Sequence, residues 1–176
     1  MIPLLCLLTL AADVPSGPEK GAALPKLEAY AVTGDDKDKT LDVTAAGKDK
    51  LTLYLIVGDE KFDRPMHRFF KAIDDKLQAD FQDVRGVTVF LTQDEKKMKE
   101  FLPRVQMSVN YGQLTLNVFQ GKEGPKDWNI NSDAHLTVLL AYKGKVVARY
   151  GYNSVNEAEA PAVLRELSKH YKKKGS

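Results

Sequence analysis

Side chains capable of chemistry gather in the stretch FDRPMHRFF, which follows an apolar run almost at once. His67 could act there as a general acid or base. Arg64 could help hold an anion at the start of a predicted helix, where backbone N–H groups are unpaired. The alternative is that Arg64 and Arg68 are solvated or paired with the carboxylates of Asp63 and Asp74. The stretch contains no cysteine, serine or threonine, so it offers no nucleophile for covalent catalysis.

A metal site is the second chemistry that the residue types allow. His67 and His135, together with a carboxylate such as that of Asp63, Asp133 or Asp59, would supply ligands for a divalent metal. The spacing of these residues along the chain matches no local metal-binding pattern, and isolated histidines are more often surface or core residues. We therefore expect no cofactor, and a metal site at His67 and His135 is the weaker alternative.

The first twelve residues, MIPLLCLLTLAA, form an apolar run that is too short to span a bilayer and ends in small residues. The run predicts an export signal cleaved near Ala11 or Ala12, although no Lys or Arg precedes it. We expect an exported protein, periplasmic or extracellular, with no stable membrane span in the mature chain. Cys6, the only cysteine, would leave with the signal, so the mature chain would hold no thiol and no cysteine-rich metal site.

Length and charge limit the number of domains and the kinds of partner. A chain of 176 residues with 43% hydrophobic content has the size of one domain with a sizeable core. Lys and Arg total 26 against 24 for Asp and Glu, and the one dense basic run, residues 172–174, lies at the C-terminal end after a predicted helix. Such a run complements the helix dipole, so we expect no nucleic-acid partner.

Apolar runs of strand length alternate with segments of helical period. Asp63 or Arg64 is a suitable N-cap for the first helix, Pro65 suits its first turn, and Pro103 is expected to end the second helix. Gly144 supplies the tight turn of a hairpin. The predicted elements are, in chain order, strand 51–57, helix 65–81, strand 87–92, helix 94–102, strand 114–119, strands 136–142 and 145–150, and helix 160–171.

This order of elements implies an α/β fold. Strands that alternate with helices and then end in a β-hairpin predict a mixed sheet that is covered on both faces. The turn-rich segment QGKEGPKDWNINSDA separates the third strand from the hairpin. Its tryptophan, Trp128, is expected to fill the core beneath a loop.

The chain resembles the thioredoxin superfamily over residues 24–171, and its layout is closest to exported thioredoxin-like and peroxiredoxin-like proteins. In that family Cys-x-x-Cys-Arg opens the first long helix, and RPMHR occupies that place here, with Arg64 and His67 at the two cysteine positions. The run HLTVLLAYKGK matches the family's strand before the hairpin, and it puts His135 where the family has a cis-proline. The resemblance implies a thioredoxin-like three-layer sandwich, a mixed central sheet with helices on both faces, but no thiol chemistry.

The resemblance also implies where a site would lie. In the family the helix-opening turn adjoins the cis-proline segment, so residues 59–67 and 132–135 are expected to form a binding groove at the former redox site. The expected domain plan is an export signal at 1–12, a linker at 13–23, a thioredoxin-like domain at 24–172 and a basic tail at 173–176. The expected groove residues are Asp63, Arg64, Pro65, His67, Arg68, Asp133 and His135.

Three functions from different classes remain open on the sequence. The leading expectation is an exported, redox-inactive domain that binds a protein or peptide at the groove, and that is not an enzyme. The alternative is a cysteine-free enzyme or metal-binding protein that uses His67 and His135 in the former dithiol pocket, which requires those side chains to converge. The third is a structural domain of a larger envelope assembly, for which an exposed apolar patch away from the groove would be the sign.

Overall fold

The computed structural model describes residues 14–171. The predicted export signal with Cys6 and the predicted basic tail lie outside these residues. The strands are β1 (Glu28–Ala31), β2 (Thr40–Asp42), β3 (Thr52–Gly58), β4 (Arg85–Thr92), β5 (Leu114–Gln120), β6 (Leu136–Tyr142) and β7 (Lys145–Tyr152). The α-helices are α1 (Arg64–Asp80), α2 (Glu95–Val109) and α3 (Ala160–His170), and the one-turn 3₁₀ helices are η1 (Ala45–Gly47), η2 (Asp59–Lys61), η3 (Lys126–Trp128) and η4 (Glu157–Glu159).

One mixed sheet forms the centre of the molecule, in the strand order β2-β1-β5-β4-β3-β6-β7. The strands β3, β4 and β5 are parallel, whereas β6 and β7 on one side and β1 and β2 on the other pair antiparallel. The expected α/β class with a mixed sheet is confirmed. The sequence did not predict β1 and β2, because strands of four and three residues hold too few apolar side chains to show a pattern.

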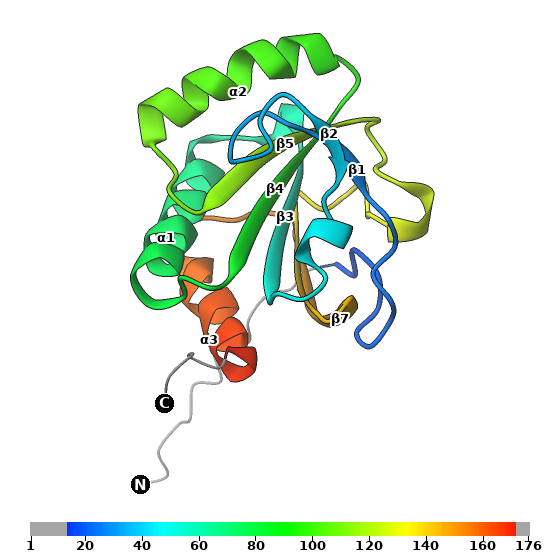
Figure 1. Cartoon of the computed structure of the whole chain (residues 1–176), viewed down its shortest axis with the longest axis vertical. Helices are drawn as coiled ribbons and strands as arrows, with labels where there is room; N and C mark the ends of the chain where they lie inside the picture. The colour runs from blue at the N-terminus through cyan, green and yellow to red at the C-terminus, as the bar shows by residue number, and fades with distance from the viewer. Residues whose placement is uncertain (1–13, 172–176) are drawn as a thin grey trace, which may run out of the picture.

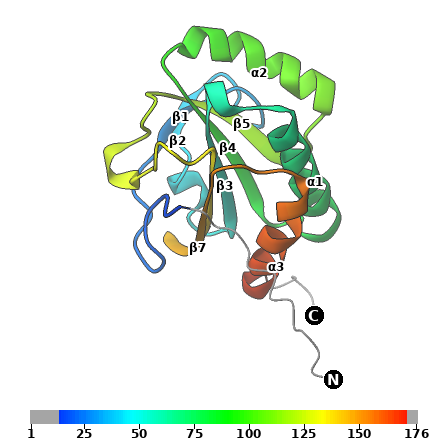
Figure 2. The ribbon, with the colours of Figure 1, turned by 180° about the vertical axis from the view of Figure 1, so that it is seen from behind.

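The three α-helices cover one face of the sheet (Figures 1 and 2). The successive crossovers from β3 to β4 and from β4 to β5 move in the same direction across the sheet, and right-handed crossovers then place α1 and α2 on the same face. We expected helices on both faces. The second face instead carries its own core cluster beneath the chain before β1 and the segment with η3, drawn blue and yellow on the right of Figure 1.

Helix α1 begins as its sequence dictates. The Asp63 side chain is the N-cap, and its Oδ1 accepts a hydrogen bond from the backbone N–H of Met66 at 2.9 Å. Pro65 lies in the first turn, where its missing N–H leaves no hydrogen bond unmade. The apolar residues at helical spacing are all buried against the sheet, namely Met66, Phe69, Phe70, Ile73 and Leu77.

Helix α2 continues past Pro103, so the prediction that this proline ends the helix is wrong. The proline removes one backbone hydrogen bond, to the carbonyl four residues back on half-buried Lys99. The extra turns bury Val105, and the helix ends at Asn110, whose left-handed conformation (φ 54°) forms the C-cap. Packing of this last part against the core therefore outweighs the local preference of proline.

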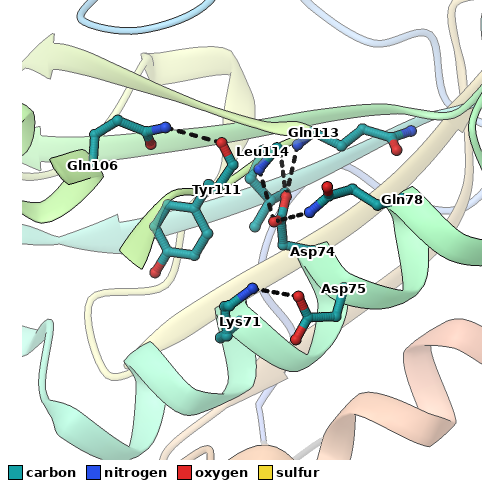
Figure 3. A network of polar contacts seen from close by, with 9 residues as sticks. Lys71, Asp74, Asp75, Gln78, Gln106, Tyr111, Gln113 and Leu114 are labelled. Atoms are coloured by element: carbon teal, nitrogen blue, oxygen red, sulfur yellow. Dashed lines mark hydrogen bonds and ion pairs between the residues drawn. The ribbon is translucent and has the colours of Figure 1, made fainter. Parts of the chain in front are cut away.

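A buried carboxylate joins α1 to the start of β5. Asp74 is 0% exposed, and its two oxygens accept hydrogen bonds from three consecutive backbone N–H groups, at 2.9 Å from Gly112 and 2.8 Å each from Gln113 and Leu114. The side-chain amide of Gln78 donates a fourth at 2.7 Å. Figure 3 shows the carboxylate pointing from α1 into this row of donors. The charge is thus held by oriented dipoles rather than by a basic side chain.

Residues 14–23, for which we expected a linker, lie against β6 and β7. The backbone N–H of Val14 donates to Gly151 O and that of Gly21 to Val146 O, while buried Ser16 is hydrogen-bonded to Thr137 (Oγ–Oγ1 2.5 Å). A Cβ on Gly17 (φ 88°) would come within 2.7 Å of a Leu139 methyl carbon. The segment is therefore built into the second core face.

The hairpin and the closing helix match the predictions. Lys143 and Gly144 both have positive φ (52° and 71°), as a two-residue hairpin turn requires. A capping box made by Asn156 and Glu159 precedes α3. Within residues 14–171, no helix is both long enough and apolar enough to cross a membrane.

Candidate binding site

The turn that opens α1 is where the sequence predicted a site. Strand β3 ends at Gly58 and η2 follows directly; Asp63 then caps the helix and Arg64 is its first residue. The Arg64 side chain is exposed at the helix N-terminus. The position at which the resemblance places a nucleophile therefore presents a cation at the N-terminus of the helix.

A lysine joins this turn to the segment before β6. The Lys61 ammonium donates hydrogen bonds to the backbone carbonyls of Ser132 and Ala134, the second at 3.0 Å. The two segments expected to form a groove are thus adjacent, as the resemblance implies, and Lys61 bridges them. Sequence reasoning missed Lys61, because its two acceptor residues lie 71 and 73 positions further along the chain. No local pattern marks such long-range hydrogen bonds.

A hollow of about 510 Å³ lies beside the bridge, beneath residues 122–134. Ile56 and Leu91 from the sheet supply apolar surface, and the lysine bridge lies along one side. The ion pair between Lys122 and Glu60 (3.1 Å) joins the loop to η2 across the hollow. Asp59 also lines it, with its carboxylate accepting a hydrogen bond from the Thr92 hydroxyl at 2.5 Å. Four of the charged side chains that line this hollow, those of Asp59, Glu60, Lys61 and Lys122, thus already have partners.

The predicted groove residues separate into two groups. Asp63, Arg64, His67 and Arg68 line a second hollow of about 850 Å³ between α1 and α2, which we call the α1–α2 hollow. His135 is not part of that lining.

The other predicted groove residues lie outside that hollow. Asp133 and His135 are exposed on the segment before β6, where the His135 backbone N–H donates to Tyr152 O at 2.7 Å. Pro65 is half-buried in the first turn of α1.

His67 packs between two aromatic rings. The centroid of its ring is 6.2 Å from that of Phe62 and 6.1 Å from that of Tyr111. Burial lowers the pKa of His67 from the ordinary 6.5, because it disfavours the charged imidazolium. The neutral ring is therefore favoured, and it can donate one hydrogen bond and accept another.

Arg68 pairs with a residue that sequence reasoning did not consider. Its Nε donates to Glu157 Oε2 at 2.8 Å, joining α1 to η4, so pairing of Arg68 with Asp63 or Asp74 is wrong. The hydrogen bond from Arg68 lowers the pKa of Glu157. Both side chains are more than half exposed, so the pair adds little to stability.

The metal alternative gains no support from the arrangement of ligands. Among residues 14–171, no three side chains of His, Cys, Asp or Glu are grouped so that they could hold a metal ion. The peptide bond before His135, at the family's cis-proline position, is trans, as are all peptide bonds in the described range. Trp128 fills the second core face at 0% exposure, as predicted, and its Nε1–H donates to Lys26 O at 3.3 Å.

Comparison with solved structures identifies the fold. The pneumococcal exposed lipoprotein thioredoxin from Streptococcus pneumoniae superposes with a TM-score of 0.60 at 16% identity, over 82% of this chain and 99% of that one. A peroxiredoxin-like protein from Aquifex aeolicus gives 0.60 at 13% identity over 90% of each chain. A thioredoxin-like protein from Porphyromonas gingivalis gives a TM-score of 0.58 at 22% identity, over 88% of this chain and 97% of that one.

No protein-family model and no curated protein sequence matches the chain. The assignment of the fold therefore rests on structural likeness. At sequence identities of 13 to 22%, this likeness establishes the fold alone. The chain has a thioredoxin-like fold, as its resemblance to that superfamily implied.

Proposed function

We propose that this thioredoxin-like domain acts by binding a protein or peptide and carries out no thiol chemistry. One observation carries the proposal: Arg64, directly after the N-cap Asp63, occupies the first position of α1, where thiol chemistry on this scaffold needs a nucleophilic cysteine. Similar structures are named thioredoxin and peroxiredoxin-like, and those names describe those proteins. The candidate surface is the helix-opening turn, residues 59–68.

The surroundings of the turn favour binding over catalysis. His67 is the group there best suited to proton transfer, and its described ring contacts are the aromatic rings of Phe62 and Tyr111. His135, the second member of the alternative enzyme or metal site, is exposed and is not among the residues that line the α1–α2 hollow. A structural role in a larger assembly is the remaining alternative, and the exposed Met107 on α2 is the feature that it would use.

Export belongs to the same proposal. The apolar run at residues 1–12 supports an export signal, and cleavage after Ala11 or Ala12 would keep the hydrogen bonds that Val14 and Ser16 make. The expected location is periplasmic or extracellular. N-terminal sequencing of the protein recovered from fractionated cells tests this, because a first residue at Met1 in the soluble fraction would contradict it.

Activity assays on the chain without residues 1–12 test the absence of thiol chemistry. We expect no acceleration of insulin reduction by dithiothreitol and no thiol-dependent consumption of peroxide. The double variant Arg64→Cys, His67→Cys is the positive control, because it places two thiols one helical turn apart on the same scaffold. Reductase or peroxidase activity in the chain without these substitutions would overturn the proposal.

A selection from a random peptide library tests the binding function. We expect enriched peptides whose addition shifts the amide NMR signals of residues 59–68. The same selection on the variant Asp63→Ala, Arg64→Glu provides the comparison, since it reverses the charge at position 64 and removes the helix cap. If no peptide is enriched, or if the shifts fall only elsewhere, the turn is not the binding surface.

A further inference from the structure

The α1–α2 hollow combines apolar surface with arginine side chains. Phe62 from the helix-opening turn and Phe101, Val105 and Val109 from α2 provide the apolar part. Phe101 is 42% exposed, which is unusual for a phenylalanine. A side chain from a partner would remove this aromatic surface from water.

Two of the arginines that line the hollow are free to bind an anion. Arg68 is paired with Glu157. In the described part of the chain, the guanidinium groups of Arg64 and Arg104 have no ion-pair partner. Of the carboxylates nearby, Asp63 is hydrogen-bonded to the start of α1. Two planar groups with several donors each therefore face the hollow, and such groups bind carboxylates in a bidentate manner.

A buried polar atom lies behind the histidine of the hollow. Tyr111 is 4% exposed, and its hydroxyl has no hydrogen-bond partner among the described residues. Its ring packs on that of His67, which lines the hollow. Figure 3 shows the hydroxyl directed away from Asp74 and its donors. A hydrogen-bonding group of a ligand that reaches past His67 would satisfy this hydroxyl, and leaving it unpaired is costly.

We propose that the α1–α2 hollow binds an acidic peptide segment that carries a large apolar side chain. The apolar side chain packs on Phe62 and Phe101, and flanking carboxylates pair with Arg64 and Arg104. The inference rests on the proposed binding function and names its partner class. Charge complementarity decides in favour of this occupant: the lining holds three arginines and one aspartate, the arginines lie beside an aromatic surface, and the hollow is open along two helices, as a peptide requires.

Titration of a labelled peptide tests the proposal directly. The probe is Ac-EDFLEDL-NH2, and its binding to the chain without residues 1–12 is measured by fluorescence anisotropy. We expect binding that weakens at least about fivefold in Arg104→Glu and in Phe101→Ser, because each removes one of the two recognition elements. Both positions are exposed, so both variants keep the fold. Lys76→Glu, an exposed charge reversal near the end of α1, is the matched control and leaves the affinity unchanged.

Two further probes separate the outcomes. The basic peptide Ac-KKFLKKL-NH2 and the peptide Ac-EDSSEDS-NH2, which lacks apolar side chains, should both bind at least about fivefold more weakly. Equal binding of the acidic and basic peptides, or no effect of Arg104→Glu, overturns the proposal. Binding to vesicles of phosphatidylcholine and phosphatidylglycerol in the absence of peptide binding also overturns it, in favour of an anionic membrane.

Failure of this inference differs from failure of the proposed function. If library peptides bind at the helix-opening turn while the acidic probe does not, the binding function stands and this partner class is wrong. If the chain catalyses thiol reactions or selects no peptide, the proposed function fails as well.

Discussion

At the scale of single residues, Asp74 and Lys61 each hold two segments together through backbone groups rather than through an opposite charge. Asp74 accepts from three consecutive N–H groups at the start of β5, and Lys61 donates to two carbonyls before β6. Backbone partners are present whatever side chains surround them. These two contacts therefore depend on a single side chain each, and single substitutions can measure them.

Asp74→Asn should lower the free energy of unfolding by about 2 to 4 kcal/mol, because an amide NH₂ then faces backbone donors in a buried site. Chemical denaturation followed by circular dichroism measures the change. Asp75→Asn is the matched control, since this neighbour is exposed and its pair with Lys71 adds little. A loss for Asp74→Asn no larger than that of the control would refute the role given to the buried carboxylate.

Lys61→Met should loosen the segment before β6 without unfolding the protein. Removing the two hydrogen bonds costs about 1 kcal/mol of local stability, which corresponds to about fivefold faster amide exchange of Ala134 and His135. Hydrogen–deuterium exchange with mass spectrometry reads this out. Lys71→Met, which removes a half-buried lysine of α1 that is paired with exposed Asp75, serves as control. Unchanged exchange at residues 131–135 would count against the bridge.

The pKa of His67 gives stability a defined pH dependence. Burial holds this pKa below 6.5, so between the folded-state pKa and 6.5 the unfolded chain binds more protons than the folded one. The contribution of neutral His67 is fully present above pH 6.5 and is lost as the pH falls toward the lowered value. An NMR titration should give a midpoint below 6.5 for His67, and His67→Gln should flatten the stability profile in that window. A midpoint at or above 6.5 would contradict the burial of this ring.

At the scale of elements, the helix α2 carries the proline that our sequence reasoning misread. Pro103 lies in the interior of a helix whose second half lines the α1–α2 hollow with Arg104, Val105 and Val109. A helix that ended at Leu102 would not form this wall. The packing of the second half thus creates the surface on which the further inference rests.

Pro103→Ala should stabilise the protein by about 1 to 2 kcal/mol, because it restores the hydrogen bond to the carbonyl of Lys99. The gain is less than the full interior-proline penalty, because the unfolded chain becomes more flexible. The midpoint of denaturation measures it. Pro161→Ala is the matched control: Pro161 lies in the first turn of α3, where no bond is missing, so this change should not stabilise. Equal effects at both positions would show that the helix bonding around Pro103 is not what limits stability.

The sequence predicted the elements whose own residues decide them. Strand β3 is a continuous apolar run, and α1 has an aspartate cap, an early proline and a helical spacing of apolar residues, so both were predicted to within one or two residues. The short β1 and β2 form only because β5 provides a partner for β1. No property of four or three residues alone could indicate this.

The local part of the candidate site was predictable from the sequence, whereas its long-range contacts were not. The placement of Arg64 and His67 on the first turn of α1 follows from Asp63 and Pro65. The Lys61 bridge and the pairing of Arg68 with Glu157 depend on residues that are 71 to 89 positions away. Such contacts form only in the folded protein, so they cannot be predicted from a pattern within one stretch of sequence.

At the scale of the whole molecule, the sheet has one face covered by helices and one covered by irregular chain. Residues 14–23 are part of that second cover, with Ser16 and Gly17 against Thr137 and Leu139. The guanidinium of Arg149 adds a hydrogen bond to Gly17 O at 2.7 Å. We therefore propose that the stable unit includes these residues and is larger than the segment 24–171 that carries the sequence resemblance.

Two truncations test this extent. Removal of residues 1–12 should leave the free energy of unfolding unchanged, whereas removal of residues 1–20 should lower it by about 3 kcal/mol. The longer truncation uncovers Leu139 and leaves the hydroxyl of Thr137 without its partner. Denaturation of the two proteins under the same conditions provides the comparison. If they are equally stable, residues 14–20 do not contribute to the core.

The contacts of this N-terminal segment determine when it can dock on the rest of the protein. The chain is made from its N-terminus, yet Val14, Gly17 and Gly21 bond to Gly151, Asn129 and Val146, which are made more than 100 residues later. The first described residues can thus dock only after most of the described chain has been made. Until the β6–β7 hairpin is available, this N-terminal segment has no docking site, and the part of the second face that it covers stays open.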